Sequence, residues 1–273
     1  MTTNAADTTT AKEKNDARLK LPFIPKHYEL SYEKIDFSSF TFAGTVAIQA
    51  QGCAAAEIAA ASSLCPNSVT IHCHEVQIIE ATLSYEDIVL SAQALNYHVR
   101  NQTCTIVFDA KQSENIWKQG CEYLLTLSFR GEVNDKLCGL YRSTYVDAAN
   151  GTSHTIATTQ FEPTDARRAF PCFDEPAIKA TFSVTVRAPV DLQVISNTPP
   201  ETILTEENRK YKKVRFQQTP RMSTYLVALV MGKFDCVSAT SASKTFQNSI
   251  TTTVYTVPGK AEQGLFCLET AKR

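Results

Sequence analysis

Short segments in which apolar and polar residues alternate recur through most of the chain, and they limit the folds it can adopt. Residues 122–130 place four apolar side chains on one face of a strand, namely Tyr123, Leu125, Leu127 and Phe129. The same pattern occurs in residues 27–35, 40–49, 68–83, 103–108, 179–187, 212–216 and 223–231. A period of two, with turn residues between the runs, predicts an all-β fold, an antiparallel β-sandwich.

Two local features modify this pattern. Gly44 lies inside one alternating run, where a glycine indicates a β-bulge. Residues 54–63 are rich in alanine and carry no turn signal, and we interpret them as a loop.

The two ends of the chain differ from its middle. Residues 1–17 are polar and predict a disordered tail, which leaves residues 18–237 as the β-sandwich domain. Residues 238–249 are rich in Ser, Ala and Thr, and we interpret them as a linker. A strand is expected to follow at residues 251–257. Residues 260–273 place Ala261, Leu265 and Leu268 at helical spacing, so we expect a helix that packs on a domain the sequence does not supply. Residues 238–273 are therefore expected to be a linker and the truncated start of a second domain.

Composition excludes several classes of function. With 273 residues and 43% hydrophobic residues, the chain has enough apolar material for one large β domain or two small ones. The net charge of −1 argues against binding to nucleic acid or to a membrane surface through bulk charge. The longest apolar run, residues 225–231, is far shorter than the ~20 residues of a membrane-spanning helix.

The nine cysteines indicate a reducing compartment. They show no C-x-x-C spacing, and several lie inside apolar runs, as in residues 103–108; they are Cys53, Cys65, Cys73, Cys104, Cys121, Cys138, Cys172, Cys236 and Cys267. Free, buried cysteine behaves as a small hydrophobic residue. Together with the absence of a signal-peptide pattern, this predicts a cytoplasmic protein.

Residues 159–176, TQFEPTDARRAFPCFDEP, are unusually polar for a segment that lies between strand-like runs. They combine Gln160, Glu162, two adjacent arginines and the acidic pair Asp174 and Glu175. Pro163 and Asp165 are typical of the first turn of a helix, and Pro171 should end that turn. Such a segment predicts either a site or a domain joint.

This segment resembles the signature at the end of the N-terminal domain of gluzincin-type zinc aminopeptidases, the family of puromycin-sensitive aminopeptidase and aminopeptidase N. Four more landmarks occur in the family's order: residues 139–143 (GLYRS), 179–182 (KATF), 196–199 (SNTP) and 219–226 (TPRMSTYL). The resemblance covers about residues 19–273. It implies that the second domain begun by residues 238–273 is the zinc peptidase domain.

The resemblance also implies roles for two residues. Glu162 matches the family's T-Q-x-E glutamate, which receives the α-ammonium group of a peptide substrate through charge-assisted hydrogen bonds. Gln160 matches a glutamine that lines the pocket for the first substrate side chain. Four charged residues are instead interpreted as ion pairs that hold the loop and the domain joint: Arg167, Arg168, Asp174 and Glu175.

The zinc motif of the family, H-E-x-x-H, is missing from this sequence. Residues 74–78, HEVQI, have isoleucine where the second histidine must stand, and two histidines one helical turn apart are needed to face one metal ion. His72 and His74 would share one strand face but supply only two ligands. We therefore expect no catalytic residue and no metal site in this chain, and zinc only in the full-length enzyme.

Two functions remain open from the sequence. The first is the N-terminal domain of a zinc aminopeptidase that removes N-terminal residues from peptides, with peptide N-termini and the missing catalytic domain as partners. One charge-assisted hydrogen bond contributes roughly 1.5–3 kcal/mol, whereas millimolar binding needs about 4 kcal/mol, so the fragment alone is expected to be inactive. The second is a non-catalytic β-sandwich scaffold derived from this family.

Overall fold

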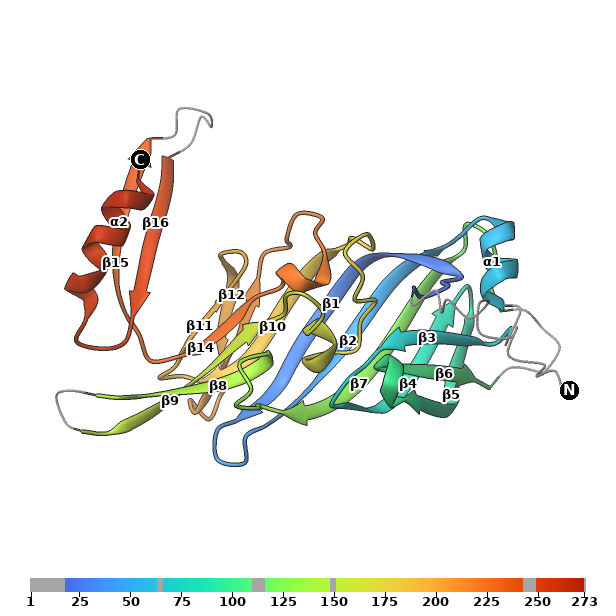
Figure 1. Cartoon of the computed structure of the whole chain (residues 1–273), viewed down its shortest axis with the longest axis horizontal. Coiled ribbons are helices and arrows are strands. Elements are labelled where there is room, and N and C mark those ends of the chain that lie inside the picture. The colour runs from blue at the N-terminus through green and yellow to red at the C-terminus, as the bar shows by residue number, and fades with distance from the viewer. Residues whose placement is uncertain (1–17, 63–65, 110–115, 148–150, 243–248, 273) are drawn as a thin grey trace, which may run out of the picture.

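The computed structural model of the chain describes residues 18–62, 66–109, 116–147, 151–242 and 249–272. These residues form three sheets and a few short helices (Figure 1). The predicted all-β class is confirmed. The expected disordered tail, residues 1–17, lies outside the described residues. No helix in the described ranges is long and apolar enough to cross a membrane.

The main sheet has the strand order β12-β13-β10-β1-β2-β7-β4-β5-β6-β3. Its strands in chain order are β1 (Phe23–Asp36), β2 (Thr41–Gly52), β3 (Ser68–His72), β4 (Val76–Tyr85), β5 (Ile88–His98), β6 (Thr103–Phe108), β7 (Glu122–Glu132), β10 (Thr181–Pro189), β12 (Pro200–Thr205) and β13 (Tyr211–Phe216). All neighbours in this sheet are antiparallel except β1 and β10, which run parallel. A parallel pair requires a long crossover between its strands, and here more than a hundred residues intervene.

The alternation seen in the sequence produces one continuous core. The four residues predicted to share a face of β7 are all buried, as are Phe182, Val184 and Val186 of β10. The rings of Tyr28 and Phe182 stack across the parallel pair with their centroids 4.8 Å apart. Since apolar burial is the main stabilising contribution to such a sheet, these inward-facing residues fix the register of its strands.

The bulge predicted at Gly44 is confirmed. The register of β1 against β2 shifts between Tyr32 and Lys34, opposite Gly44 and Ala43. A β-carbon added to Gly44 would lie only 2.2 Å from the carbonyl oxygen of Ser31. The close approach of the two backbones therefore requires glycine at this position.

The alanine-rich segment expected to be a loop contains a helix, so that prediction is wrong. Helix α1 spans Ala55–Ser62. Alanine has the highest intrinsic helix propensity, and Ile58, only 5% exposed, anchors the helix to the core. At the start of the helix, the carboxylate of Glu57 accepts a hydrogen bond from the amide of Ala54 (3.3 Å).

A second sheet has the order β11-β14-β9-β8. Its strands are β8 (Gly139–Val146), β9 (Ser153–Gln160), β11 (Gln193–Ser196) and β14 (Leu229–Gly232). The last residue of β9, Gln160, pairs with Gly139. The polar signature segment therefore begins where this sheet ends.

A small unit follows at the C-terminal end and stands apart from both sheets in Figure 1. It consists of the hairpin β15 (Asp235–Ala242) and β16 (Ser249–Thr256), the short helix η4 (Ala261–Gly264) and α2 (Leu265–Ala271). Residues 238–242 are thus strand rather than linker, and residues 243–248 lie outside the described part. Because β15 crosses the expected boundary at residues 237/238, we propose that this unit begins at Asp235.

The C-terminal helix packs against another part of this chain, whereas we expected it to pack on a domain that the sequence does not supply. Helix α2 packs on the hairpin, and Leu268 is 4% exposed there. Leu265 and Phe266 remain exposed. One hairpin is therefore sufficient to bury part of the predicted apolar stripe.

Substituting Gly44→Ala should lower the free energy of unfolding by roughly 1–3 kcal/mol, because the added methyl group collides with a backbone carbonyl. Urea unfolding of the purified chain measures this. Thr45→Ala, at the exposed neighbouring position, is the control and should change stability by less than about 0.5 kcal/mol. Equal stability of Gly44→Ala and the wild type would contradict the close approach at the bulge.

Candidate functional site

The signature segment forms a tight turn after β9, and the short helix expected to start at residues 162–165 begins later, at Ala166. Residues 162–165 are in turn conformation, and the 3-10 helix η2 (Ala166–Arg168) follows. The amide of Asp165 donates to the carbonyl of Phe161 (2.7 Å). Phe161 and Phe170 are buried at the two ends of the turn and their rings meet edge to face at 6.1 Å. The turn is thus fixed at both ends, while its tip faces solvent.

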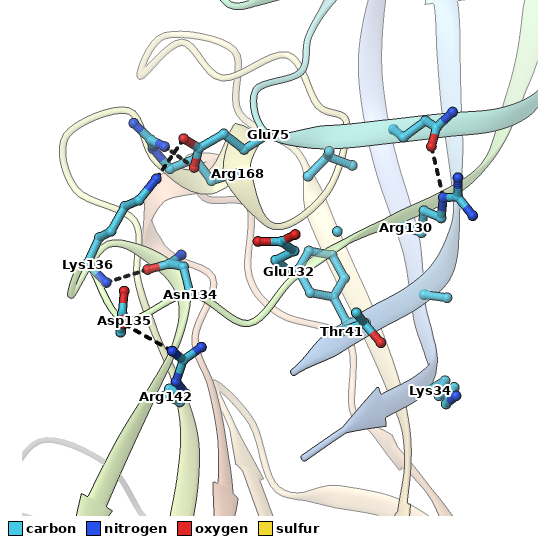
Figure 2. Close-up of a pocket in the computed structure, with 15 residues that line it drawn as sticks. Lys34, Thr41, Glu75, Arg130, Glu132, Asn134, Asp135, Lys136, Arg142 and Arg168 are labelled. Carbon is cyan, nitrogen blue, oxygen red and sulfur yellow. Dashed lines mark hydrogen bonds and ion pairs between the residues drawn. The ribbon is translucent and has the colours of Figure 1, made fainter. Parts of the chain in front are cut away.

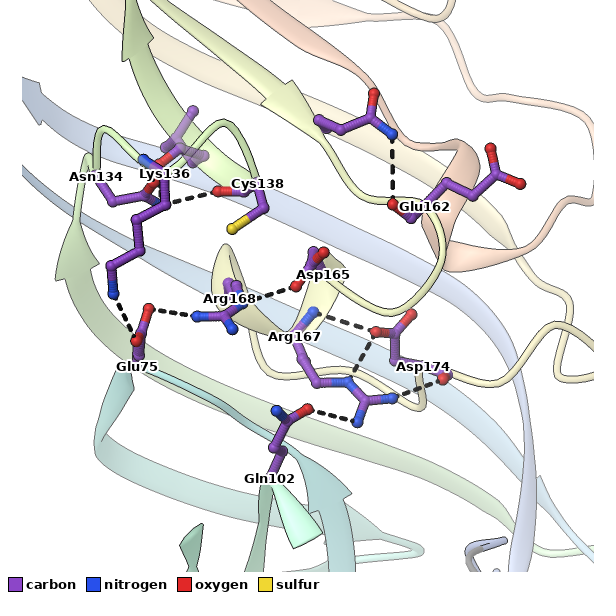
Figure 3. A network of polar contacts seen from close by, with 12 residues as sticks. Glu75, Gln102, Asn134, Lys136, Cys138, Glu162, Asp165, Arg167, Arg168 and Asp174 are labelled. Carbon is purple, nitrogen blue, oxygen red and sulfur yellow. Dashed lines mark hydrogen bonds and ion pairs between the residues drawn. The ribbon is translucent and has the colours of Figure 1, made fainter. Parts of the chain in front are cut away.

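Arg167 and Asp174 form a buried ion pair beneath this turn (Figure 3). Nε of Arg167 donates to Oδ2 of Asp174 (3.0 Å), and a second guanidinium nitrogen donates to the Asp174 carbonyl (3.1 Å). Gln102 and Thr224 complete the network, Gln102 as an acceptor from Arg167 (3.2 Å) and Thr224 as a donor to Oδ1 of Asp174 (2.5 Å). Buried charges are tolerated when they are paired and hydrogen-bonded in this way.

The second arginine of the signature has different partners. Nε of Arg168 donates a hydrogen bond to Asp165 (2.7 Å), and its Nη1 forms an ion pair with Glu75. The carboxylate of Glu75 also forms an ion pair with Nζ of Lys136 (2.9 Å). Burial alone would raise the pKa of Glu75, but the hydrogen bonds from Lys136 and Arg168 outweigh it and hold that pKa below its usual value. Arg168 therefore ties the turn to the bend between β3 and β4 and to the loop before β8.

Glu175 forms no ion pair with Arg167 or Arg168, although we expected it to do so from the sequence. Its Oε1 accepts a hydrogen bond from the backbone amide of Leu19 (2.6 Å). Of the four residues expected to hold the joint, Arg167 and Asp174 contact each other, whereas Arg168 and Glu175 each bind elsewhere. Glu75, Lys136 and Thr224 belong to the same networks and were missed, although Thr224 lies in the TPRMSTYL landmark.

Glu162 and Gln160, the two candidate substrate-binding residues, lie next to each other at the exposed end of β9. The amide of Gln160 contacts the backbone carbonyl of Glu162 (3.4 Å). Figure 3 shows the carboxylate of Glu162 pointing away from Arg167 and Arg168. It makes no hydrogen bond or ion pair with the residues that the structure describes. This carboxylate is therefore available to an external cation.

A cleft of about 910 Å³ opens on another part of the surface (Figure 2). Glu75, Lys136 and Arg168 gather at one end of it, and Arg130 lies at the other. Neither Gln160 nor Glu162 lines this cleft. The cleft and the candidate ammonium receptor are therefore separate features of the domain.

His72 and His74 do not share a strand face, contrary to expectation. His72 ends β3 and is buried, whereas His74 lies in the bend that follows. Nδ1 of His72 accepts a hydrogen bond from the amide of Asp174 (3.1 Å). Across the described ranges, no three His, Cys, Asp or Glu residues come together in a group that could hold a metal ion. His72 therefore supports the signature segment and belongs to no zinc-ligand set in these ranges.

Burial, and secondarily the positive charge of Arg167, lower the pKa of His72 to about 3. The unfolded chain takes up this proton near pH 6.5, whereas the folded chain does not until about pH 3. Stability should therefore fall as the pH drops through this window, by at most about 1.4 kcal/mol per pH unit for one histidine.

In His72→Gln this contribution is removed, so we expect a shallower loss of stability between pH 6.5 and 4.5 in urea unfolding. His98→Gln, at an exposed position, serves as the control and should keep the wild-type slope. An unchanged slope in His72→Gln would show that His72 is not the buried neutral histidine described here.

Comparison with known proteins gives one consistent result. The profile of the Peptidase M1 N-terminal domain matches residues 24–226. Aminopeptidase M1 of Arabidopsis thaliana is 36% identical over 260 residues, which are 93% of this chain and 26% of that protein. The alanine/arginine aminopeptidase of Saccharomyces cerevisiae is 36% identical over 249 residues (91% and 26%). The puromycin-sensitive aminopeptidase of Caenorhabditis elegans is 46% identical over 145 residues (53% and 15%).

The chain thus spans about a quarter of the length of the first and second of these relatives, and its match covers less of the third. The family profile covers most of the main sheet, the second sheet and the signature turn between them. On this evidence the chain belongs to the peptidase M1 family and contains the N-terminal domain of that family.

Proposed function

We propose that this chain is the N-terminal part of a zinc aminopeptidase and that Glu162 recognises the α-ammonium group of the peptide substrate. The observation that carries this proposal is the exposed Glu162 carboxylate, which has no partner within the described residues. The turn that bears it is fixed by the buried pair of Arg167 and Asp174. An unpartnered carboxylate on a fixed turn is suited to bind a cation without first breaking an internal contact.

The neighbouring residue extends this recognition. Gln160 lies beside Glu162 and keeps its amide at the same exposed edge. An amide can donate and accept hydrogen bonds at a pocket wall. Glu162 would thus select a free chain end, while Gln160 would line the pocket for the first side chain of the peptide.

The rest of the reaction depends on groups outside this chain. Zinc, when bound in the complete enzyme, would polarise the scissile carbonyl and activate water. The present sequence lacks H-E-x-x-H, and its contribution is to position the substrate. The catalytic domain is accordingly the partner that we propose for this domain.

A cytoplasmic location fits the cysteines. The described cysteines are all free, and Cys53, Cys73, Cys104 and Cys172 are buried among apolar side chains. Free buried thiols are typical of a reducing compartment. Cys65 lies outside the described residues.

The test of Glu162 requires a protein that contains the zinc site. We would use a chimaera in which residues 1–273 replace the matching part of the Arabidopsis aminopeptidase M1. In Glu162→Gln, loss of the charge-assisted hydrogen bond should lower kcat/KM for an aminoacyl substrate by roughly 10- to 100-fold.

Glu207→Gln removes the same charge at another exposed position and should leave kcat/KM unchanged. An active chimaera in which Glu162→Gln matches the wild type would refute the role of Glu162 while keeping the aminopeptidase assignment. An inactive chimaera whose domain nevertheless binds a stoichiometric protein partner would favour the scaffold function.

The purified 273-residue chain should neither bind zinc tightly nor hydrolyse an aminoacyl chromogenic substrate, because it carries one carboxylate of the site and no zinc motif. Metal analysis after dialysis against a weak chelator measures the zinc content. One zinc per chain, or turnover above that of a heat-denatured sample, would contradict this expectation.

A further inference from the structure

An apolar pocket of about 530 Å³ lies where the chain enters β1, away from the residues assigned to peptide recognition. Four segments form its walls: the approach to β1, the residues around the start of α1, the end of the signature with the residues that follow it, and Arg221. Its apolar lining includes Leu21, Phe23, Ile24, Cys53 and Ile178. A concave, mainly apolar site of this size is typical of pockets that bind small molecules.

The rim of this pocket is positively charged. Four cationic and two acidic residues line it. Both acids are already engaged by backbone amides, Glu57 by Ala54 and Glu175 by Leu19. Lys20, Lys179 and Arg221 make no ion pair with any described residue. Cationic side chains therefore outnumber acidic ones at the rim, and three of the cations have no ion-pair partner among the described residues.

Two of these cations are held close to each other by the backbone. Ala180 and Met222 exchange two backbone hydrogen bonds, of 3.1 and 2.9 Å, in an isolated antiparallel bridge. Nε of Arg221 also donates to the carbonyl of Lys179 (3.1 Å). Lys179 and Arg221 therefore extend from adjacent backbone positions beside the pocket, from which both side chains can reach one anion.

The pocket is also built in advance of any ligand. The amide of Leu19 is fixed to Glu175 (2.6 Å), and the amide of Cys53 to the carbonyl of Pro22 (3.0 Å). Burial, with the nearby Glu57, raises the pKa of the Cys53 thiol to about 11. The thiol is therefore neutral at physiological pH and serves as an apolar wall rather than a nucleophile.

We propose that this pocket binds a free fatty acid with an alkyl chain of about twelve carbons or more. The alkyl chain would lie along the apolar walls, and the carboxylate would meet the cations of the rim, in particular Lys179 and Arg221. Each buried methylene group should strengthen binding by roughly fourfold, and Lys179 and Arg221 should favour an acid over a neutral lipid. The preceding residues 1–17 have Met1 as their one large apolar side chain, so they offer no apolar face to fill the pocket.

The single tryptophan of the chain gives a direct readout. Trp117 contacts the ring of Phe23, a wall of the pocket, with the centroids 5.4 Å apart. Laurate, kept below micelle formation, should change Trp117 fluorescence saturably, with isothermal calorimetry as the independent measurement. The uncharged lipid 1-dodecanol, which has the same chain length, should bind at least about tenfold more weakly.

Two double variants with equal changes in net charge separate the rim from bulk electrostatics. Lys179→Glu/Arg221→Glu should weaken laurate binding by about tenfold or more and leave 1-dodecanol unaffected. Arg209→Glu/Lys260→Glu reverses two exposed cations away from the pocket and should bind laurate as the wild type does. Circular dichroism melting confirms that each variant is folded.

Three results would overturn the proposal. The first is equal affinity for laurate and 1-dodecanol, which would show apolar binding without carboxylate recognition. The second is unchanged laurate affinity in folded Lys179→Glu/Arg221→Glu. The third is the absence of saturable fluorescence change and of binding heat up to about 100 μM laurate, the range expected when a chain of this length is buried.

Discussion

The buried pair of Arg167 and Asp174 sets the position of the signature turn, and the proposed role of the domain depends on that position. The pair donates a hydrogen bond to Gln102 and accepts one from Thr224, and the backbone amide of Asp174 donates to Nδ1 of His72; these three partners are far apart in sequence. Removing one member of such a pair leaves an uncompensated buried charge and typically costs 3–5 kcal/mol. The turn is therefore held in one arrangement, and Glu162 is presented to solvent from a fixed base.

The two adjacent arginines show where sequence reasoning reaches its limit. Both were expected to form ion pairs in the joint, yet Arg167 is buried against Asp174 while Arg168 lies nearer the surface and reaches Glu75. Their different burial depends on which strands cover each side of the turn, and no local pattern encodes that. Glu162, by contrast, could be singled out because its immediate neighbours in sequence carry the resemblance.

The strands were predictable where apolar and polar residues alternate and the apolar face is the buried one. Strands β7 and β10 follow this rule because one of their faces is packed on the core. Strand β15 does not: its Ser- and Thr-rich residues after 237 alternate weakly and were interpreted as a linker, whereas β16 was predicted as a strand at residues 251–257. Helix α1 was missed for another reason: its alanine-rich sequence has no apolar stripe, and among its described side chains Ile58 provides the anchor.

The parallel pairing of β1 with β10 has a consequence for synthesis on the ribosome. His27 pairs with Thr181, so one edge of β1 stays unpaired until a strand about 150 residues later has been synthesised. At ordinary elongation rates this delay is roughly 10–30 s. During that time β2 can cover one edge of β1 while the other edge, the future neighbour of β10, stays open. Nascent chains at this stage present an unpaired strand edge with which another chain can pair.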